Sequence, residues 1–196
     1  MARSRPDRLT SSPGLAAAAL LGLFFVSERR LRPDRDARDL NPGEDDRGST
    51  AAIGATFGTA MLIAPVASRV ARSRLPALAR WAGVAAMAGG IGLRIWSARS
   101  LGASYTRTLR VRPEQQTVEA GPYRVLRHPG YAGDIVLWAG WGLAWGTWSG
   151  WALSALPNLF AYLYRIRVEE AMLARKLGHG YWSYQSRTWR LVPGVW

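Results

Sequence analysis

The 196-residue chain contains no cysteine, and this absence removes several kinds of chemistry at once. Without cysteine there is no disulfide scaffold, no thiolate-ligated zinc or iron–sulfur centre and no thiol nucleophile. The chain also has only two histidines, and we expect no metal site. Any chemistry must therefore be carried by other residue types.

Acidic residues are also scarce: 13 Asp and Glu stand against 26 Lys and Arg, which leaves a net charge of +13. An excess of positive charge of this size first suggests nucleic-acid binding. However, 48% of the residues are hydrophobic, which excludes a disordered basic tail. The length argues for a single domain, so the placement of the charges along the chain decides between the remaining classes.

Long uncharged runs are what the chain has instead. Residues 49–68 form a run of 20 residues without a charge, long enough to cross the roughly 30 Å hydrocarbon core of a bilayer as a helix. Residues 9–27 form a second uncharged run. Residues 75–97 form a third apolar run, which Arg80 and Arg94 interrupt. We expect these two arginines to snorkel towards opposite ends of their span.

The longest uncharged run, residues 135–164, is too long for one span. Residues 146–150 at its centre read as a turn, which predicts a tight hairpin of two helices over 131–146 and 150–165. Pro157 is expected to bend the second helix. The sequence therefore predicts an all-α polytopic membrane protein with about five transmembrane helices, the last two forming a C-terminal hairpin.

The first uncharged run has an alternative interpretation as a secretory signal peptide. Arg3, Arg5 and Arg8 would form its positively charged start. No small-x-small cleavage site follows Val26, so we favour a retained span.

The positive charges collect on one side of these spans. With the N-terminus outside, the inside receives residues 28–50, 94–130 and 165–196, which together hold most of the 26 cations. The positive-inside rule therefore predicts an external N-terminus and a cytosolic C-terminus. The 28–50 segment holds more than half of the acids and no aromatic residue, so we interpret it as a solvated loop and expect no nucleic-acid partner.

Two pairs of glycines lie inside the predicted spans at the spacing that lets helices approach closely. They are Gly54 with Gly58, and Gly142 with Gly146. We interpret both pairs as positions of close helix packing.

Two polar segments flank the hairpin and are the candidates for chemistry. In residues 121–134, Pro129 and Gly130 predict irregular backbone whose donors a ligand could use, next to one of the two histidines, His128. The alternative is a turn at which Arg127 and His128 contact lipid headgroups.

The second segment, residues 165–178, reads as a helix that leaves the membrane and ends at Gly178. Arg165 and Glu169 are four residues apart and therefore share a face. One interpretation is a simple surface ion pair. However, Arg165 directly follows the apolar hairpin arm, where a charge is costly and usually functional.

The order of these residues resembles the isoprenylcysteine carboxyl methyltransferase family over roughly residues 105–196. Part of the pattern, Arg-His-Pro-x-Tyr, is shared with phospholipid methyltransferases and sterol reductases. The residues that carry the resemblance are Gly121, Tyr123, Arg127, His128, Pro129, Gly130, Tyr131, Ala132, Gly133, Arg165, Glu169, Glu170, Leu177, Gly178, Tyr181, Tyr184 and Pro193.

The resemblance implies a membrane enzyme with a cytosolic pocket for S-adenosylmethionine. It implies that Arg165 lies near the methyl acceptor and that Arg165 and Glu169 are catalytic. The residues that it implies for cofactor binding are Gln115, Gln116, Thr117, Val118, Tyr123, His128, Pro129, Gly130, Tyr131 and Glu169. Residues 101–196 would then form the catalytic core, and residues 1–100 would supply three spans without assigned chemistry.

The implied reaction is physically coherent. Methyl transfer is an in-line displacement, so positioning supplies most of the catalysis. A carboxylate acceptor is already ionised and needs no base, and Arg165 could orient it with two hydrogen bonds. The expected partners are membrane lipids and a lipophilic acceptor, prenylated or not, that enters from the bilayer.

Three other functions stay open at this point. One is an NADPH-dependent membrane reductase of the sterol-reductase type, because the Arg-His-Pro-x-Tyr-x-Gly pattern fits that group as well. The second is a phospholipid N-methyltransferase, and the third is a membrane scaffold without catalysis.

Overall fold

The computed structural model describes residues 12–31, 43–71, 74–105, 108–109 and 117–196. Within these ranges the chain forms six α-helices and no strand, which confirms the all-α class. The helices are α1 (Ser12–Leu31), α3 (Ser49–Val70), α4 (Ala77–Leu101), α5 (Pro129–Ala144), α6 (Trp148–Leu177) and α7 (His179–Ser186). Three short 3-10 turns accompany them: η1 (Glu44–Asp46), η2 (Gly102–Ser104) and η3 (Gly121–Arg124).

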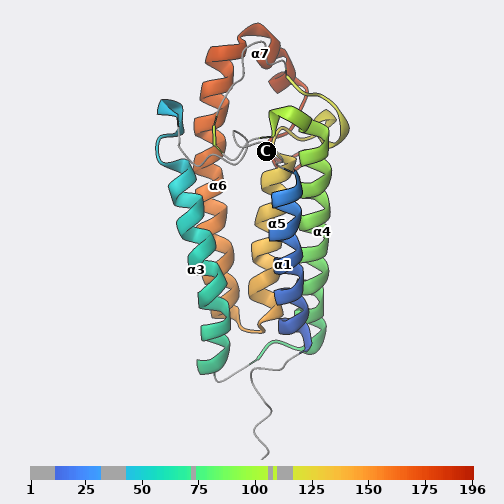
Figure 1. The fold of residues 1–196 in the computed structure, drawn as a ribbon, viewed down its shortest axis with the longest axis vertical. Coiled ribbons are helices and arrows are strands. Elements are labelled where there is room, and N and C mark those ends of the chain that lie inside the picture. Colours follow the sequence, from blue (N-terminus) through green and yellow to red (C-terminus); the bar gives the residue numbers. More distant parts are fainter. Residues whose placement is uncertain (1–11, 32–42, 72–73, 106–107, 110–116) are drawn as a thin grey trace, which may run out of the picture.

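The helices form an elongated bundle around a central hairpin of α5 and α6 (Figure 1). Helix α4 packs along α5, and α3 packs along α6. Helix α1 lies mainly against α4 and α3 mainly against α6, and both also contact α5 (Figure 1). At one end α6 continues beyond the other helices, and α7 follows it there.

The central hairpin confirms the predicted turn. Gly146 adopts a positive φ of 83°, which favours glycine, and the Thr147 side chain accepts the backbone N–H of Gly150 at 3.1 Å, which caps the start of α6. Helix α6 is one continuous helix of 30 residues, so the predicted second arm and the predicted helix beyond it are a single element. The helix continues through Pro157. It ends at Leu177 with Gly178 as its C-cap, which confirms the predicted end.

Close contact between α4 and α5 depends on glycine on both helices. A Cβ atom built on Gly90 would lie 2.4 Å from the carbonyl oxygen of Gly133, and one built on Gly140 would lie 2.5 Å from that of Gly83. Real Cβ atoms do not approach this closely. The two backbones can therefore pack this tightly only because side chains are missing at these positions.

The predicted glycine pairs have different outcomes. No atom of another described element lies within 4 Å of a Cβ built on Gly54 or Gly58, so among the described helices the prediction of close packing at that pair is wrong. A Cβ on Gly142 would lie 2.5 Å from the Cα of Trp151 in α6, which confirms close packing there. Glycine spacing in the sequence marks where an approach is permitted, whereas the neighbouring helix decides where it occurs.

The two arginines of α4 were expected to snorkel, and for Arg94 this is wrong. Its Nε donates to Glu28 of α1 at 2.9 Å, and its Nη1 donates to Asp134 of α5. Asp134 also accepts a hydrogen bond from the hydroxyl of Tyr162 in α6. Arg94 of α4 thus links α1 and α5 directly and α6 through Asp134. It does not snorkel, because two carboxylates from other helices lie within hydrogen-bonding distance.

Among the described helices, one is long and apolar enough to cross a membrane, namely α3. Only 17% of its most apolar 18-residue window is buried, unlike the core helix of a soluble protein, which is mostly buried. One such helix is weak support for membrane insertion. The other four predicted spans do not meet these criteria of length and hydropathy. Charged, aromatic or small residues lower the hydropathy of some of them, and α5 has only 16 residues. They therefore stay predictions.

Candidate functional site

The segment that carries His128 is fixed by the C-terminal end of the chain. The backbone N–H of Arg127 donates to the carbonyl of Trp189 at 2.7 Å, and that of His128 donates to the carbonyl of Arg190 at 3.1 Å. Helix α5 begins directly afterwards at Pro129, a residue suited to the first helical position. The irregular backbone predicted around His128 is therefore held in place on one side by the C-terminal segment.

Glu170 of α6 joins this segment to the C-terminal residues. Its carboxylate accepts hydrogen bonds from Nε of Arg127 and from Nε of Arg190, each at 2.8 Å. The same carboxylate lies 3.3 Å from Nε2 of His128. Burial alone would raise the pKa of Glu170, but His128 and Arg127 outweigh it and lower the pKa to about 2. Glu170 is thus a fully engaged structural carboxylate.

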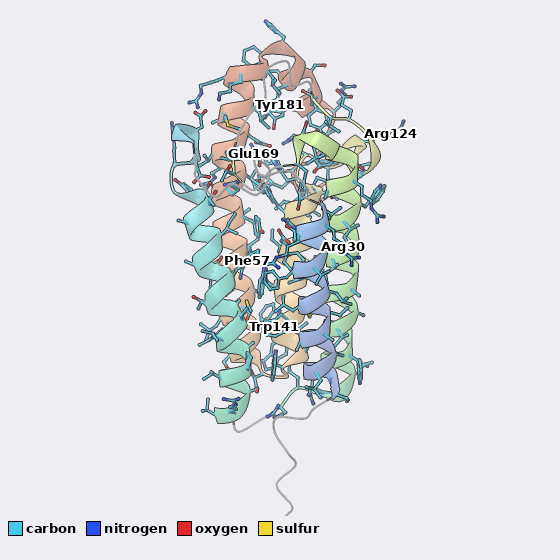
Figure 2. All side chains as sticks on the ribbon, viewed as in Figure 1. Arg30, Phe57, Arg124, Trp141, Glu169 and Tyr181 are labelled. Carbon is cyan, nitrogen blue, oxygen red and sulfur yellow. The ribbon has the colours of Figure 1, made fainter. Side chains whose placement is uncertain are left out.

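A cavity of about 410 Å³ lies beside this cluster. That volume is within the range of roughly 300–1,000 Å³ in which proteins hold small molecules. One part of its wall is apolar and comes from α1 and α3, with Phe24, Phe25, Ile53, Gly54 and Phe57. Figure 2 shows Phe57 and Glu169 at two levels along the length of the bundle, the apolar level below the polar one.

Glu169 is the acidic residue of α6 that lines this cavity. Its Oε2 is buried and has no hydrogen-bond partner within the described part of the chain, and it lies 3.6 Å from Nδ1 of His128. A buried carboxylate oxygen without a hydrogen bond is costly and usually reflects a functional role. Glu169 therefore offers an acceptor to a ligand in the cavity.

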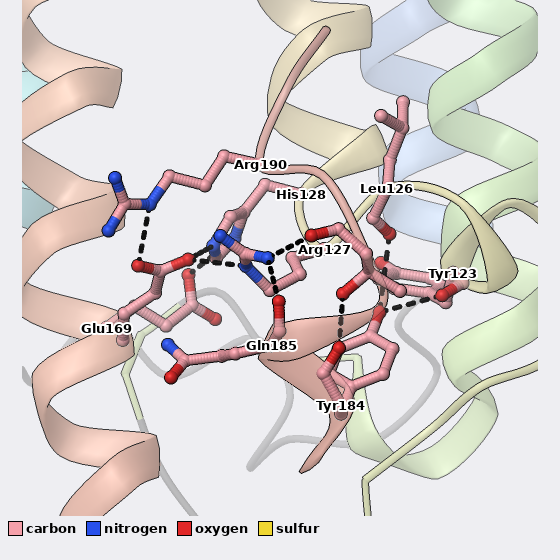
Figure 3. Close-up of polar contacts among 10 residues, drawn as sticks. Tyr123, Leu126, Arg127, His128, Glu169, Tyr184, Gln185 and Arg190 are labelled. Carbon is pink, nitrogen blue, oxygen red and sulfur yellow. Dashed lines mark hydrogen bonds and ion pairs between the residues drawn. The ribbon is translucent and has the colours of Figure 1, made fainter. Parts of the chain in front are cut away.

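Two tyrosines complete the polar wall. The ring of Tyr131 stacks on His128, with 5.5 Å between ring centroids and 3° between planes. Burial, and secondly the charge of Glu169, raise the pKa of Tyr123 well above its usual value, so this phenol stays protonated. The hydroxyl of Tyr184 donates to the carbonyl of Tyr123 at 2.8 Å and fixes that turn (Figure 3).

Arg165 lines the same cavity, but its guanidinium is already engaged. Its Nη1 donates to Asp46 at 2.7 Å, and its Nε donates to the hydroxyl of Tyr131 at 3.2 Å. Burial would raise the pKa of Asp46, but hydrogen bonds from Thr50 and the charge of Arg165 outweigh it and lower that pKa. The interpretation of residues 28–50 as a solvated loop is therefore wrong for Asp46 and for Glu28, which are buried partners of arginines.

Most of the residues predicted from the sequence meet in this cavity. Gln115 and Gln116 lie outside the described residues. Pro129 is buried and does not line the cavity. The predicted residues that line it are Thr117, Val118, Tyr123, His128, Gly130, Tyr131, Arg165 and Glu169.

The sequence reasoning missed the cavity residues that lie far from the motif. Glu28, Arg94 and Tyr105 form one hydrogen-bonded group in the wall, in which the hydroxyl of Tyr105 donates to Glu28 at 2.8 Å. Asp46 carried no signal of its own, since it is one acid among several in a charged segment. Within the described ranges no group of three or more His, Asp or Glu residues gathers as metal ligands would.

Known proteins share features of this sequence and of this fold. The sequence model of the phospholipid methyltransferase family matches residues 78–180, which is more than half of the chain. Among solved structures, the fold is similar to that of the eukaryotic intramembrane Ras methyltransferase ICMT (isoprenylcysteine carboxyl methyltransferase), with a TM-score of 0.67. That match covers 96% of this chain and 70% of that chain at 18% sequence identity, so it establishes a shared fold. Among curated proteins, no sequence matches this one significantly.

Proposed function

This chain belongs to the phospholipid methyltransferase family, and from that premise we propose that it is an integral membrane enzyme that transfers a methyl group from S-adenosylmethionine to a lipophilic acceptor. The observation that carries the proposal is Glu169, whose buried Oε2 has no hydrogen-bond partner in the described part of the chain and lies at a cavity of suitable size. Membrane insertion with an external N-terminus and a cytosolic site belongs to the same proposal.

The residues around Glu169 fit the cofactor. When bound, S-adenosylmethionine supplies an electrophilic methyl group and also carries an ammonium group and a carboxylate. Glu169 would accept hydrogen bonds from a cationic or donor group, and the protonated Tyr123 would donate one. The stacked rings of His128 and Tyr131 would hold the cofactor against the wall. Gln115, Gln116, Thr117 and Val118 belong to the proposed cofactor set as well.

The apolar part of the cavity supports a lipophilic acceptor. Its phenylalanines come from α1, which packs mainly on α4, and from α3, which packs mainly on α6. An acyl or prenyl chain placed there would bring its head group towards Arg165 and Glu169. We assign the cofactor and acceptor chemistry to residues 101–196, while residues 1–100 contribute cavity walls.

Two kinds of acceptor head group are candidates, a carboxylate and a neutral amine. A carboxylate, as in the resemblance, would be oriented by Arg165. However, Nη1 of Arg165 is bound to Asp46, so a carboxylate that needed this nitrogen would have to displace an internal one. That observation favours a neutral amine, as in phospholipid N-methylation, as the second candidate.

The first test is isothermal titration of the detergent-purified protein with S-adenosylhomocysteine and, separately, with NADPH. We expect S-adenosylhomocysteine to bind with a stoichiometry near one and NADPH not to bind. Binding of NADPH alone would support a reductase and contradict the proposal. Binding of neither compound would support a membrane scaffold.

The second test identifies the acceptor. Membranes that contain the protein are incubated with methyl-labelled S-adenosylmethionine, and the labelled lipid-soluble product is treated with mild base. A methyl ester releases its label as methanol, whereas an N-methyl group keeps it. Absence of any labelled product above membranes that carry the Glu169→Gln variant would contradict methyl transfer.

A further inference from the structure

Arg165 and Glu169 stand in a relation that needs an explanation. They are four residues apart on α6, which is the spacing at which oppositely charged side chains of a helix meet. Both line the same cavity. Nevertheless, Oε2 of Glu169 is buried and, within the described part of the chain, accepts no hydrogen bond.

Arg165 instead pairs with an acid of η1, directly before the start of α3. Nη1 of Arg165 donates to Oδ1 of Asp46 at 2.7 Å, and Arg165 and Asp46 are 4% and 1% exposed. The same nitrogen donates to the hydroxyls of Ser49 and Thr50, each at 2.8 Å. Three oxygens of one helix start thus surround a single guanidinium nitrogen.

Asp46 is itself held firmly in this position. Its Oδ2 accepts the backbone N–H of Thr50 at 3.1 Å, and its Oδ1 accepts the hydroxyls of Thr50 and Ser49 at 2.6 and 3.1 Å. The carboxylate therefore cannot turn away from Arg165 without breaking the bonds at the start of α3. The neighbouring Asp45 points to the other side and pairs with Arg175 and Lys176 on the exposed side of α6. Exposed ion pairs of this kind contribute little to stability.

We propose that Asp46 is a positioning residue that holds Arg165 away from Glu169 and thereby keeps the Glu169 carboxylate open for the cofactor. This inference rests on the proposed function, in which Glu169 binds S-adenosylmethionine. For a buried guanidinium the loss of one carboxylate partner is costly, because its charge is then less well compensated. If Asp46 loses its charge, the carboxylate one turn further along α6 takes its place, and the cofactor must then compete with Arg165.

The decisive measurement is calorimetric titration of the full-length, detergent-purified protein with S-adenosylhomocysteine. The Asp46→Asn variant should bind it roughly tenfold more weakly, because a charge-assisted bond to Glu169 must first be broken. Adding Arg165→Gln removes the competitor, so the double variant should return to within about twofold of the wild-type affinity. Asp45→Asn is the matched control, an adjacent acid on η1 that should leave affinity unchanged.

The same titration separates positioning from simple structural damage. A merely structural loss lowers the bound stoichiometry and the melting temperature while the remaining protein binds normally. The proposal requires a weaker Kd at unchanged stoichiometry, with rescue in the double variant. If Asp46→Asn does not fold, the Ser49→Ala/Thr50→Val variant loosens the hold on Arg165 with its charge pair intact, and it should weaken binding about threefold.

Each outcome has one meaning. Wild-type affinity in both Asp46→Asn and Ser49→Ala/Thr50→Val would overturn the inference and leave the proposed function standing, as would a weakened Asp46→Asn that Arg165→Gln fails to rescue. Failure of the wild-type protein to bind S-adenosylhomocysteine would overturn the proposed function, and this inference with it.

Discussion

Two neighbouring faces of α6 carry adjacent acids in opposite situations. On one face Glu170 is bonded by Arg127 and Arg190 and lies beside His128. On the cavity face, about 100° around the helix, Oε2 of Glu169 has no hydrogen-bond partner within the described residues. A buried acid with every oxygen paired holds elements together, whereas a buried carboxylate oxygen without a hydrogen bond indicates a ligand-binding role. The difference predicts that one residue controls stability and the other controls binding.

The largest effect is expected from Glu170→Gln. The substitution leaves Arg127 and Arg190 without their shared carboxylate, and breaking a buried pair in this way costs about 3–5 kcal/mol. The melting temperature of the purified protein should therefore fall by roughly 6–20 °C, measured by the loss of helical circular dichroism. A melting temperature like that of the wild type would mean that the Glu170 face does not hold the C-terminal segment.

The next effect is expected from Glu169→Gln, which is the matched substitution on the other face. It removes the charge offered to the cofactor, so affinity for S-adenosylhomocysteine should fall at least about a hundredfold, or about 2.7 kcal/mol. The melting temperature should not fall, because Oε2 of Glu169 accepts no hydrogen bond from the described residues and its contact with Nδ1 of His128 is long, at 3.6 Å. A lower melting temperature with unchanged affinity would reverse the roles of the two faces.

The smallest effect is expected from pH. The pKa of Glu170 is lowered to about 2 from an ordinary value of 4.5, so its stabilising contribution is complete above the unfolded-state pKa. That contribution is lost progressively as pH falls from about 5 towards 2. The melting temperature should therefore drop across this window, and the drop should be shallower in Glu170→Gln. Equal slopes in the two proteins would place the acid sensitivity elsewhere.

Much of the fold follows from local patterns. The uncharged runs predict helices because about 20 apolar residues match the thickness of a bilayer core, where a helix satisfies its own backbone hydrogen bonds. The turn at Gly146 and the helix end at Gly178 follow from conformations that glycine adopts readily. The close pair of α4 and α5 was not predicted, since Gly90 and Gly133 are far apart in the chain and only packing shows that they face each other.

The candidate site divides in the same way. The motif residues Tyr123, His128 and Tyr131 lie close together in the chain, and all three line one cavity. The family resemblance implied that they share a ligand. Asp46 was taken for part of a solvated loop, because an acid among many charges carries no sign of its partner. Its ion pair with Arg165 joins residues 119 positions apart.

The sequence by itself determined the absence of thiol chemistry, the helical class and the residues around which a ligand site would form. Only the tertiary structure decided which charges are paired and which carboxylate stays open. The physical reason is that helix formation depends on neighbours within a few residues, whereas the partner of a buried charge is whichever opposite charge packing brings within bonding distance. Glu169 and Glu170 are alike in the sequence, and the elements packed against each face of α6 make them different.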